Sequence, residues 1–392
     1  MKKYLIATAI ITLISVNLIY AQSWQWVSSA GSDMSNTIYA IDLDHNGNVY
    51  IGINSSGDRF YFNKNSFYPH GISDFYVAKY DINGLEVWQK QFGGYNNDWI
   101  NLKSDERILD LKYDKFNNSI LITGRFTGNY NFGCSDSNPV VDNEDQIFLT
   151  RLGLDGNCLW SKEFGSNKDD DAYSITIDDN KNIYLTGYYG SSGYFGKTYI
   201  KWGSFLAKLD NSGNCIWAKN ISVSPYPICG IKYLNNYLYV SGVNNEDRIQ
   251  IDTLHLYYPN SLGKILAKFD LNGNIQWAKH FAGPSGNYGT GFDFGADSNS
   301  NIILTGAFNS PLAIFQNDTL KSSNSKKDMY LCKFNQNGNI LWVKQTNSSE
   351  NAVGTTVYTG IDGNTYVTGS FSGEANFGSF NINSNTAKDI PF

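Results

Sequence analysis

The stretch AYSITIDDNKNIYLTGYYGSSGYFGKTYIKWGSFLAKLDNSGNCIWAK, residues 172–219, contains the pattern that decides the fold. Two β-rich runs, 172–178 and 183–189, are separated by a polar turn and predict a hairpin. A longer connection leads to a second pair of runs, 204–210 and 215–219, which another polar turn separates. The stretch therefore predicts four antiparallel strands, named a to d in chain order.

The same unit recurs along the chain, marked by three interleaved series of landmarks. A Trp followed two residues later by Lys marks strand d at Trp88, Trp160, Trp217, Trp277 and Trp342. A β-rich run closing on Gly marks strand b at Gly52, Gly124, Gly187, Gly242, Gly306 and Gly369. A run ending in Lys or Arg and a turn marks strand c, starting at Phe75, Ile147, Phe205, Ile265 and Tyr330.

Sheets of this kind hide their edges when they stack radially, which is the architecture of a β-propeller. The composition, with 15% aromatic residues and 37 glycines, also favours strands and turns. We therefore expect an all-β fold, a β-propeller of about six four-stranded antiparallel blades within residues 22–392. The predicted blades cover approximately 36–92, 108–164, 172–221, 228–281, 291–345 and 353–392.

The two ends of the repeat region predict how the ring closes. Trp26 matches strand d, whereas the C-terminal KDIPF matches the start of strand c, so neither end holds a complete blade. Residues 22–30 are therefore expected to add strand d beside the Gly369 unit, which would interlock the first and last segments. The alternative is a truncated reading frame, whose missing C-terminus would continue KDIPF into a full strand and a further blade.

The N-terminus indicates export. Lys2 and Lys3 precede an apolar run over 4–20 that ends at Ala21, which is the pattern of a signal peptide over residues 1–21. A membrane anchor is the weaker reading, because the run contains several polar residues and is shorter than the roughly 20 apolar residues of a span. We expect a secreted protein or one held at the outer cell surface, with no membrane span.

The charge of the chain argues against one class of partner, and its cysteine content argues against a disulfide-rich scaffold. The formal net charge is -6 and arginines are few, which argues against a nucleic-acid partner. The five cysteines are odd in number and too scattered for a disulfide framework, although one or two bridges could form. Cys158 and Cys215 occupy equivalent places one blade apart, too far to bridge each other, and are interpreted as small core residues.

The repeat motifs carry a family resemblance. The succession D-x-F-x-A-K-x-D-x-x-G, W-x-K-x-F-G-G, G-N-x-Y-x-T-G and F-x-G-x-x-x-F-G resembles the bacterial SBBP-type β-propeller repeat, and FTGNYNFG from Phe126 matches its last element, as does FSGEANFG from Phe371. The resemblance extends over residues 24–392 and implies the fold. It does not imply a function, because the family consists mostly of uncharacterised secreted or surface proteins without shared catalytic residues. The chain departs from it in two ways: the family name implies seven blades, and a C-terminal sorting or adhesion module is not recognised.

Strand parity separates two faces of the expected propeller. The a–b and c–d turns lie on one face, where DHNGN (44–48), DLNGN (270–274) and NQNGN (335–339) show Asx and Gly turn chemistry. A calcium loop would need more carboxylates and a distal bidentate Glu. The b–c and d–a connections lie on the other face, and the long b–c connections hold enough β-rich sequence for a small extra hairpin.

The d–a loops on this second face contain the candidate binding residues. They combine aromatic rings with amides and carboxylates, the groups that cover the apolar face of a sugar and bind its hydroxyls. The alternative is that the rings pack between blades, as most aromatic side chains do. The candidates are Tyr95, Asp98, Trp99, Asp169, Asp170, Asp171, Tyr226, Asn287 and Tyr288.

Enzymatic motifs are weak. No nucleophile-elbow, phosphate-loop or dinucleotide motif occurs, the four histidines are dispersed without metal-ligand spacing, and no cofactor is implied. Asp110, Asp293 and 169–171 lie on or near inner strands, but sequence does not give the carboxylate separation that decides glycosidase chemistry. We expect a non-enzymatic binding protein for an extracellular glycan or protein; alternatives are a structural module or fragment of a larger adhesin or envelope protein, and, third, a secreted glycan hydrolase.

Overall fold

The computed structural model describes most of the chain after its N-terminal segment, and every regular element in the described residues is a β-strand. The described residues are 30–32, 36–56, 59–62, 65–68, 73–93, 106–127, 132–134, 144–222, 228–244, 248–257, 263–281, 293–309, 311–322, 326–360, 363–384 and 390–391. The runs rich in β-branched and aromatic residues form the strands, and Asx and Gly turns join them.

The first three sheets each contain four antiparallel strands in a–b–c–d order. The first sheet consists of β2 (Asn36–Leu43), β3 (Val49–Ser56), β6 (Ser73–Tyr80) and β7 (Glu86–Phe92). The second consists of β8 (Arg107–Asp114), β9 (Ser119–Thr127), β10 (Asp145–Gly153) and β11 (Cys158–Phe164). The third consists of β12 (Asp171–Ile177), β13 (Ile183–Tyr189), β16 (Gly203–Leu209) and β17 (Cys215–Ser222).

Two further four-stranded sheets and one three-stranded sheet follow. The fourth sheet consists of β18 (Ile228–Leu234), β19 (Tyr237–Asn244), β22 (Gly263–Asp270) and β23 (Ile275–Phe281). The fifth consists of β24 (Asp293–Ala296), β25 (Ile302–Phe308), β28 (Asp328–Phe334) and β29 (Ile340–Gln345). The sixth consists of β31 (Ala352–Thr359), β32 (Thr365–Phe371) and β35 (Ile390–Pro391).

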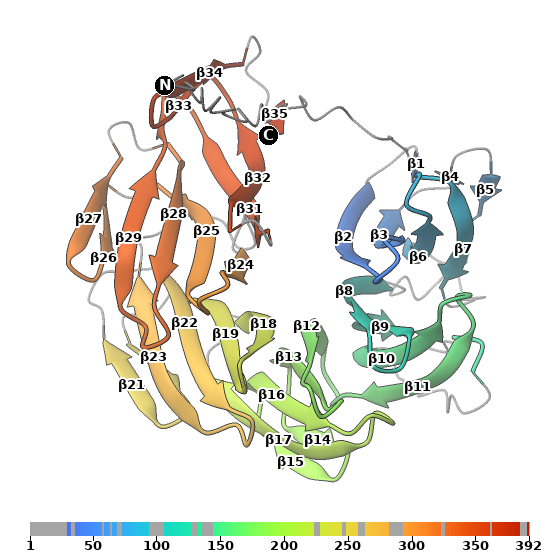
Figure 1. The fold of residues 1–392 in the computed structure, drawn as a ribbon. Coiled ribbons are helices and arrows are strands. Elements are labelled where there is room, and N and C mark those ends of the chain that lie inside the picture. Colours follow the sequence, from blue (N-terminus) through green and yellow to red (C-terminus); the bar gives the residue numbers. More distant parts are fainter. Residues whose placement is uncertain are drawn as a thin grey trace, which may run out of the picture.

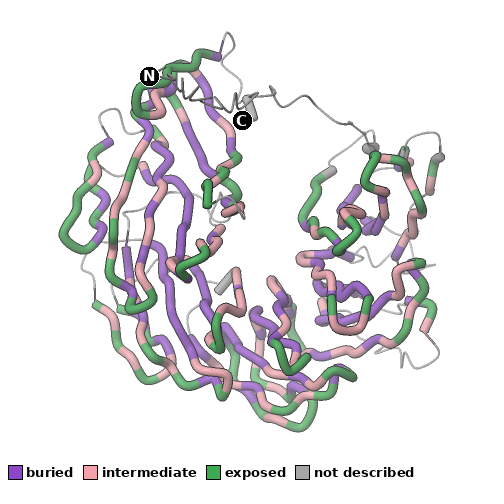
Figure 2. The backbone as a smooth tube through the Cα atoms, viewed as in Figure 1, coloured by how far each residue is buried: buried purple, intermediate pink, exposed green. Residues whose placement is uncertain are grey.

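The sheets lie side by side around an arc, with strand a of each sheet innermost and, in the five four-stranded sheets, strand d outermost (Figure 1). Buried residues concentrate on the middle strands, and exposed residues on turns, hairpins and outer edges (Figure 2). The prediction of an all-β fold of four-stranded antiparallel sheets in a propeller-like arrangement is confirmed. The number of blades and the closure of the ring stay predictions.

A small hairpin, here called a satellite hairpin, fills the b–c connection of five sheets in the described residues. Those of the third to sixth sheets pack at the end of strand d in the preceding sheet; for example, the rings of Phe164 and Phe195 stack with centroids 4.1 Å apart. These four hairpins therefore join neighbouring sheets. The five hairpins are β4 (Phe60–Phe62) with β5 (Asn65–Phe67), β14 (Gly193–Phe195) with β15 (Thr198–Ile200), β20 (Arg248–Ile251) with β21 (Leu254–Tyr257), β26 (Leu312–Phe315) with β27 (Asp318–Lys321), and β33 (Glu374–Phe377) with β34 (Phe380–Asn383).

The Trp of strand d also joins neighbouring sheets. The indole Nε1 of Trp88 donates a hydrogen bond to the carbonyl of Leu154 in the next c–d turn, at 2.7 Å, and Trp277 donates to Gln336 O at 3.1 Å. Lys79, the strand-c residue paired with Trp88, also donates to Leu154 O, at 3.5 Å. The Trp and Lys landmarks of the repeat therefore serve the contacts between sheets.

The tight turns have the Asx geometry that their sequences predict. In the turn at 270–274, Asp270 Oδ1 accepts hydrogen bonds from the backbone N–H of Asn272 (2.9 Å) and Asn274 (2.8 Å). Its second oxygen accepts from Asn274 Nδ2 at 2.9 Å. Asp44 and Asp178 make the same set of contacts in the a–b turns. The prediction of Asx turns is confirmed.

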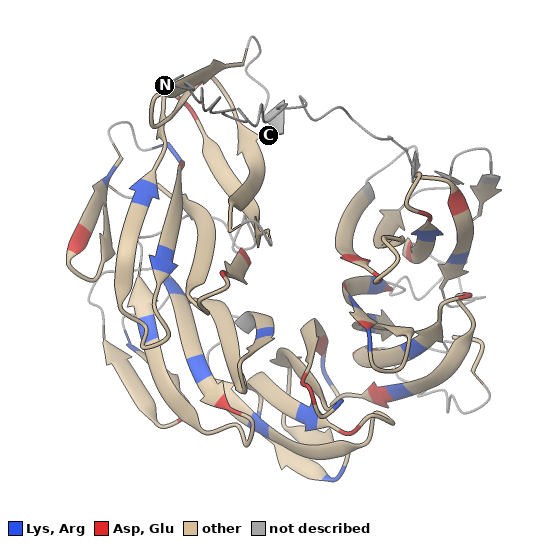
Figure 3. Ribbon diagram, in the orientation of Figure 1, with Lys and Arg blue, Asp and Glu red and all other residues tan. Residues whose placement is uncertain are grey.

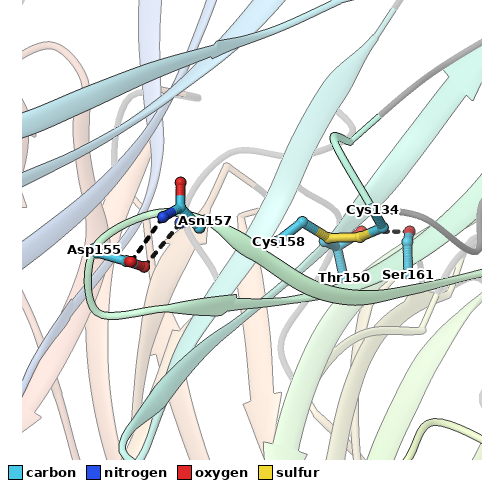
Figure 4. The surroundings of a disulfide bond; sticks show 6 residues. All are labelled: Cys134, Thr150, Asp155, Asn157, Cys158 and Ser161. Carbon is cyan, nitrogen blue, oxygen red and sulfur yellow. Dashed lines mark hydrogen bonds between the residues drawn. A yellow bond between two sulfur atoms is a disulfide. The ribbon is translucent and has the colours of Figure 1, made fainter.

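One cysteine assignment was wrong. Cys158 forms a disulfide with Cys134, with a Cα–Cα distance of 5.2 Å that suits a bridge (Figure 4). The bridge ties the b–c connection of the second sheet to the start of its strand d. The repeat pattern did not reveal this partner, because Cys134 lies in a connection that varies between units. Cys215 is a free, half-buried thiol that packs against the core of the third sheet.

The first described strand, β1 (Ala30–Ser32), pairs with β4 of the first satellite hairpin. Of residues 22–30, which were expected beside the sixth sheet, Ala30 instead pairs with Phe62. Residues 22–29 lie outside the described residues, so their expected pairing beside the sixth sheet stays a prediction. At the other end, Ile390 and Pro391 pair with β32 as the third strand, in the place expected for the start of strand c.

Candidate functional site

Most of the predicted binding residues lie outside the described residues. This holds for Tyr95, Asp98, Trp99, Tyr226, Asn287 and Tyr288, all in d–a connections. Their role in binding stays a prediction.

The three described candidates, Asp169, Asp170 and Asp171, make contacts that stabilise the d–a connection between the second and third sheets. Asp170 is buried, and its carboxylate accepts hydrogen bonds from Ser166 Oγ at 2.9 Å and Gly190 N at 2.8 Å. Burial raises its pKa to about 7, against the effect of these hydrogen bonds. Asp171 pairs with Arg125 at 3.3 Å, and Asp169 accepts from the backbone N–H of Asp145.

The inner-strand carboxylates connect adjacent sheets. Asp110 on β8 accepts hydrogen bonds from Ile175 N and Ser174 Oγ on β12, both at 2.9 Å, and burial raises its pKa. Asp293 on β24 contacts Lys232 Nζ on β18 and Val357 N on β31, both at 3.2 Å. Because β12 and β18 lie between β8 and β24 along the arc, these two carboxylates face different neighbours (Figure 1).

In the residues that the structure describes, no group of three or more His, Cys, Asp or Glu side chains is placed to hold a metal ion. The same residues include no helix long and apolar enough to cross a membrane.

A cleft of about 530 Å³ lies between the satellite hairpins of the third and fourth sheets. Residues 199–201 at the end of β15 form one wall, 218–222 of β17 form the floor, and Gln250 and Asp252 of the next hairpin form the other wall. The cleft therefore lies on the face that carries the b–c and d–a connections, here called the b–c face. The sequence predicts ligand binding on this face, but the residues that line the cleft are not the predicted ones.

Backbone contacts position both walls. The side chain of Asn220 on β17 accepts a hydrogen bond from Lys201 N at 2.7 Å and donates one to Lys201 O at 2.6 Å. Gln345 makes the equivalent pair of contacts with Lys321 in the fifth sheet. On the opposite wall, Asp252 N donates to Ile221 O at 2.9 Å. These contacts hold the two hairpins at a set distance from the floor strand.

The cleft combines an aromatic wall with charged and amide groups. Tyr199 is 58% exposed, and its ring meets that of Tyr194 edge-on with centroids 5.4 Å apart. Lys219 Nζ lies 3.3 Å from Asp252 Oδ2, and Gln250 Nε2 donates to Asp252 O at 2.8 Å. None of these residues is among the candidates predicted from the sequence; their signal is the alternation of Tyr194 and Tyr199 with the buried Phe195 and Ile200.

A comparison with protein families matches residues 159–188 to the SBBP family, described as a beta-propeller repeat. The matched segment covers strand d of the second sheet and strands a and b of the third. The resemblance to this repeat is confirmed there.

A curated relative is an uncharacterized WD repeat-containing protein of Acanthamoeba polyphaga mimivirus, which is 24% identical to this chain over 409 residues. The alignment covers 94% of this chain but 26% of the relative, so the chain spans about a quarter of the relative's length.

Several solved structures are similar. BamB from Moraxella catarrhalis has a TM-score of 0.38 at 12% identity, covering 84% of this chain and 79% of that chain. A catalytically inactive virginiamycin B lyase from Staphylococcus aureus scores 0.40 at 11% identity, with 86% and 92% covered. The Plexin A4 extracellular region scores 0.46 at 8% identity, with 90% and 46% covered. All three TM-scores lie below 0.5, so they carry no argument about what this chain binds or does.

Proposed function

We propose, from the SBBP β-propeller repeat at residues 159–188, that the chain is an exported interaction module that binds an extracellular partner through its b–c face without catalysis. The partner is a glycan or a protein. The repeat and the WD-repeat relative both favour an interaction module over an enzyme.

The observation that carries this proposal is the position of the exposed aromatic side chains. In the described residues, seven of them lie in the b–c connections: Tyr61, Tyr68, Tyr194, Tyr199, Trp202, Tyr257 and Phe380. Aromatic side chains are normally buried, and exposed ones are enriched at interaction surfaces. Asp110 and Asp293 on the inner strands are instead used in contacts between sheets.

Two features support the rest of the proposal. The disulfide between Cys134 and Cys158 suits an oxidising, extracellular compartment, as does the predicted signal peptide. Basic and acidic residues are interspersed over the described strands, which does not suit a nucleic-acid partner (Figure 3).

Binding and turnover measured on the same protein test the proposal. Residues 22–392 are titrated onto immobilised extracellular glycans and onto secreted and surface proteins of the host, and release of reducing sugar is measured in parallel. We expect saturable binding that the triple variant Tyr61→Ser, Tyr194→Ser, Tyr257→Ser weakens, with no sugar released. The control variant Leu159→Ser, Leu341→Ser changes two exposed side chains on strands d and should bind normally. Equal binding by both variants, or sugar release, would contradict the proposal.

A second candidate is a structural module of a longer adhesin or envelope protein. The length of the curated relative, of which this chain spans 26%, favours it. The mass of the mature protein in its host decides between the two. A product well above the 43.8 kDa of this chain indicates that the chain is part of a longer polypeptide.

A further inference from the structure

The satellite hairpin of the third sheet exposes two paired aromatic rings. Tyr194 on β14 and Tyr199 on β15 are cross-strand partners, exposed by 64% and 58%. Their neighbours Phe195 and Ile200 point to the other side of the hairpin and are buried in the core. Ile249 and Ile251, on the facing hairpin of the fourth sheet, are likewise buried. The core packing of both hairpins therefore does not need the Tyr199 ring, which is free to contact a ligand.

The floor and far wall of the cleft offer complementary polar groups. Lys219 and Asp252 form an ion pair that keeps 29% and 19% of the two side chains exposed. An ammonium beside a carboxylate matches a vicinal diol, because one hydroxyl accepts from Lys219 while the other donates to Asp252. Gln250 Oε1 is a further acceptor at the same wall.

We propose that this cleft is a carbohydrate-binding site, in which the Tyr199 ring stacks on a sugar and the pair Lys219–Asp252 binds its hydroxyls. The inference rests on the proposed function and names the ligand class for one site. The volume of about 530 Å³ is in the range of small-molecule sites. An extended peptide fits less well, because the floor strand already uses Ile221 O and the Asn220 side chain to hold the two hairpins.

Calorimetric titration of residues 22–392 with cello-, chito-, malto- and galacturono-oligosaccharides tests the site. We expect at least one to bind, and Tyr199→Ala to raise its Kd about 10-fold to 100-fold through loss of the ring. Tyr199→Phe keeps the ring and should stay within about threefold of the wild type. Asp252→Asn should raise the Kd about tenfold; asparagine tolerates the φ of 53° at this position.

Leu341→Ala is the control, since Leu341 is 51% exposed on β29, outside the b–c connections, and does not line the cleft. Its Kd should equal that of the wild type, and thermal melting should be unchanged in every variant. Wild-type affinity in both Tyr199→Ala and Asp252→Asn would overturn the site. Binding of a host protein without any oligosaccharide would overturn the carbohydrate class but leave the proposed function standing.

Discussion

At the scale of single residues, the tryptophan of strand d fits against the glycine of the next c–d turn. A Cβ added to Gly273 would lie 2.7 Å from the Trp217 ring, and Gly156, Gly213 and Gly338 stand in the same relation to Trp88, Trp160 and Trp277. Each of these glycines also has a positive φ. The most regular landmarks of the sequence are therefore explained by packing between sheets.

This fit predicts an unequal cost for two glycine substitutions. Gly273→Ala has to adopt a φ of 76° and to displace the Trp217 ring, whereas Gly363→Ala has to adopt a φ of 79° with no atom of the described residues within 4 Å. We expect both to destabilise the protein through backbone strain, and Gly273→Ala to cost about 1–3 kcal/mol more through overpacking. Urea unfolding measures both; equal losses would show that the ring moves aside freely.

His280 on β23 predicts acid sensitivity. Burial lowers its pKa to about 4, from the ordinary value of 6.5. Between these two values the unfolded chain binds a proton that the folded chain does not, so the free energy of unfolding falls as the pH falls from 6.5 to 4. The loss attributable to His280 is about 3 kcal/mol at the lower limit.

The variant His280→Gln isolates this effect. Gln91 and Gln345 occupy the equivalent place, three residues after Trp88 and Trp342, so the substitution suits the repeat. The difference in unfolding free energy between wild type and variant should change by about 3 kcal/mol over this pH range. Asp170, with its raised pKa, acts in the opposite direction in both proteins and cancels. A difference independent of pH would contradict the assignment.

At the scale of the elements, the b–c connection is tied to the start of strand d in its own sheet. In the second sheet the tie is the disulfide from Cys134 to Cys158. In the fifth sheet Gln316 accepts from Ile340 N at 2.9 Å and donates to Gly338 O at 2.6 Å. The same place is thus held by a covalent bond or by hydrogen bonds.

The third sheet contains one of the two cysteines of such a disulfide, Cys215, at the start of strand d. Phe195-Gly196-Lys197 matches Phe132-Gly133-Cys134, both glycines have positive φ, and a Cβ on Gly196 would lie 2.8 Å from Cys215 Cβ. Lys197→Cys should therefore bond to Cys215 and stabilise the protein by about 3 kcal/mol through closure of the intervening loop. Thiol titration and urea unfolding, with Lys197→Ser as the control, check this. Two free thiols in place of the bond would contradict the match.

The strands could be predicted from sequence because their signals are local: each run alternates or ends at a turn residue within its own unit. The contacts that build the cleft are not local. The ion pair of Lys219 with Asp252 joins the third and fourth sheets, and no periodic pattern marks it. Cys158 was misassigned for the same reason, since the path that brings Cys134 back to strand d is not specified by the repeat.

At the scale of the whole molecule, the two ends of the arc expose faces that are buried in the other sheets. Ile41 on β2 is 62% exposed, whereas the matching strand-a residue, Ile175, is 2% exposed. On the sixth sheet Tyr366 is 48% exposed, whereas its strand-b counterpart Tyr184 is fully buried. Both faces border the opening of the arc (Figure 1).

The pairing of β1 bears on whether the residues before it form a strand d. Gly31 pairs with Tyr61 in the register that Gly165 makes with Tyr194, and Asn347 with Asn376. Each first partner lies five residues after a landmark Trp, and for Gly31 this is Trp26. In the second and fifth sheets, the residue in this register lies just after the end of strand d. The position of Gly31 is therefore the one expected for a residue that follows a strand d. This supports the expectation that residues 22–29 complete the sixth sheet and bring it against β2.

Closure of the ring predicts that Ile41 is an interior residue in solution. If the completed sixth sheet packs on β2, Ile41→Ala should cost about 2–5 kcal/mol of unfolding free energy, the range for a buried aliphatic side chain. Ile175→Ala, at the equivalent and already buried position, sets the reference value. Urea unfolding of residues 22–392 should then give similar losses for both variants, and removal of residues 22–29 should abolish the cost at Ile41 but not at Ile175. If Ile41→Ala changes stability by less than about 0.5 kcal/mol in the full-length protein, as exposed positions do, the arc stays open and the two bordering faces are surface.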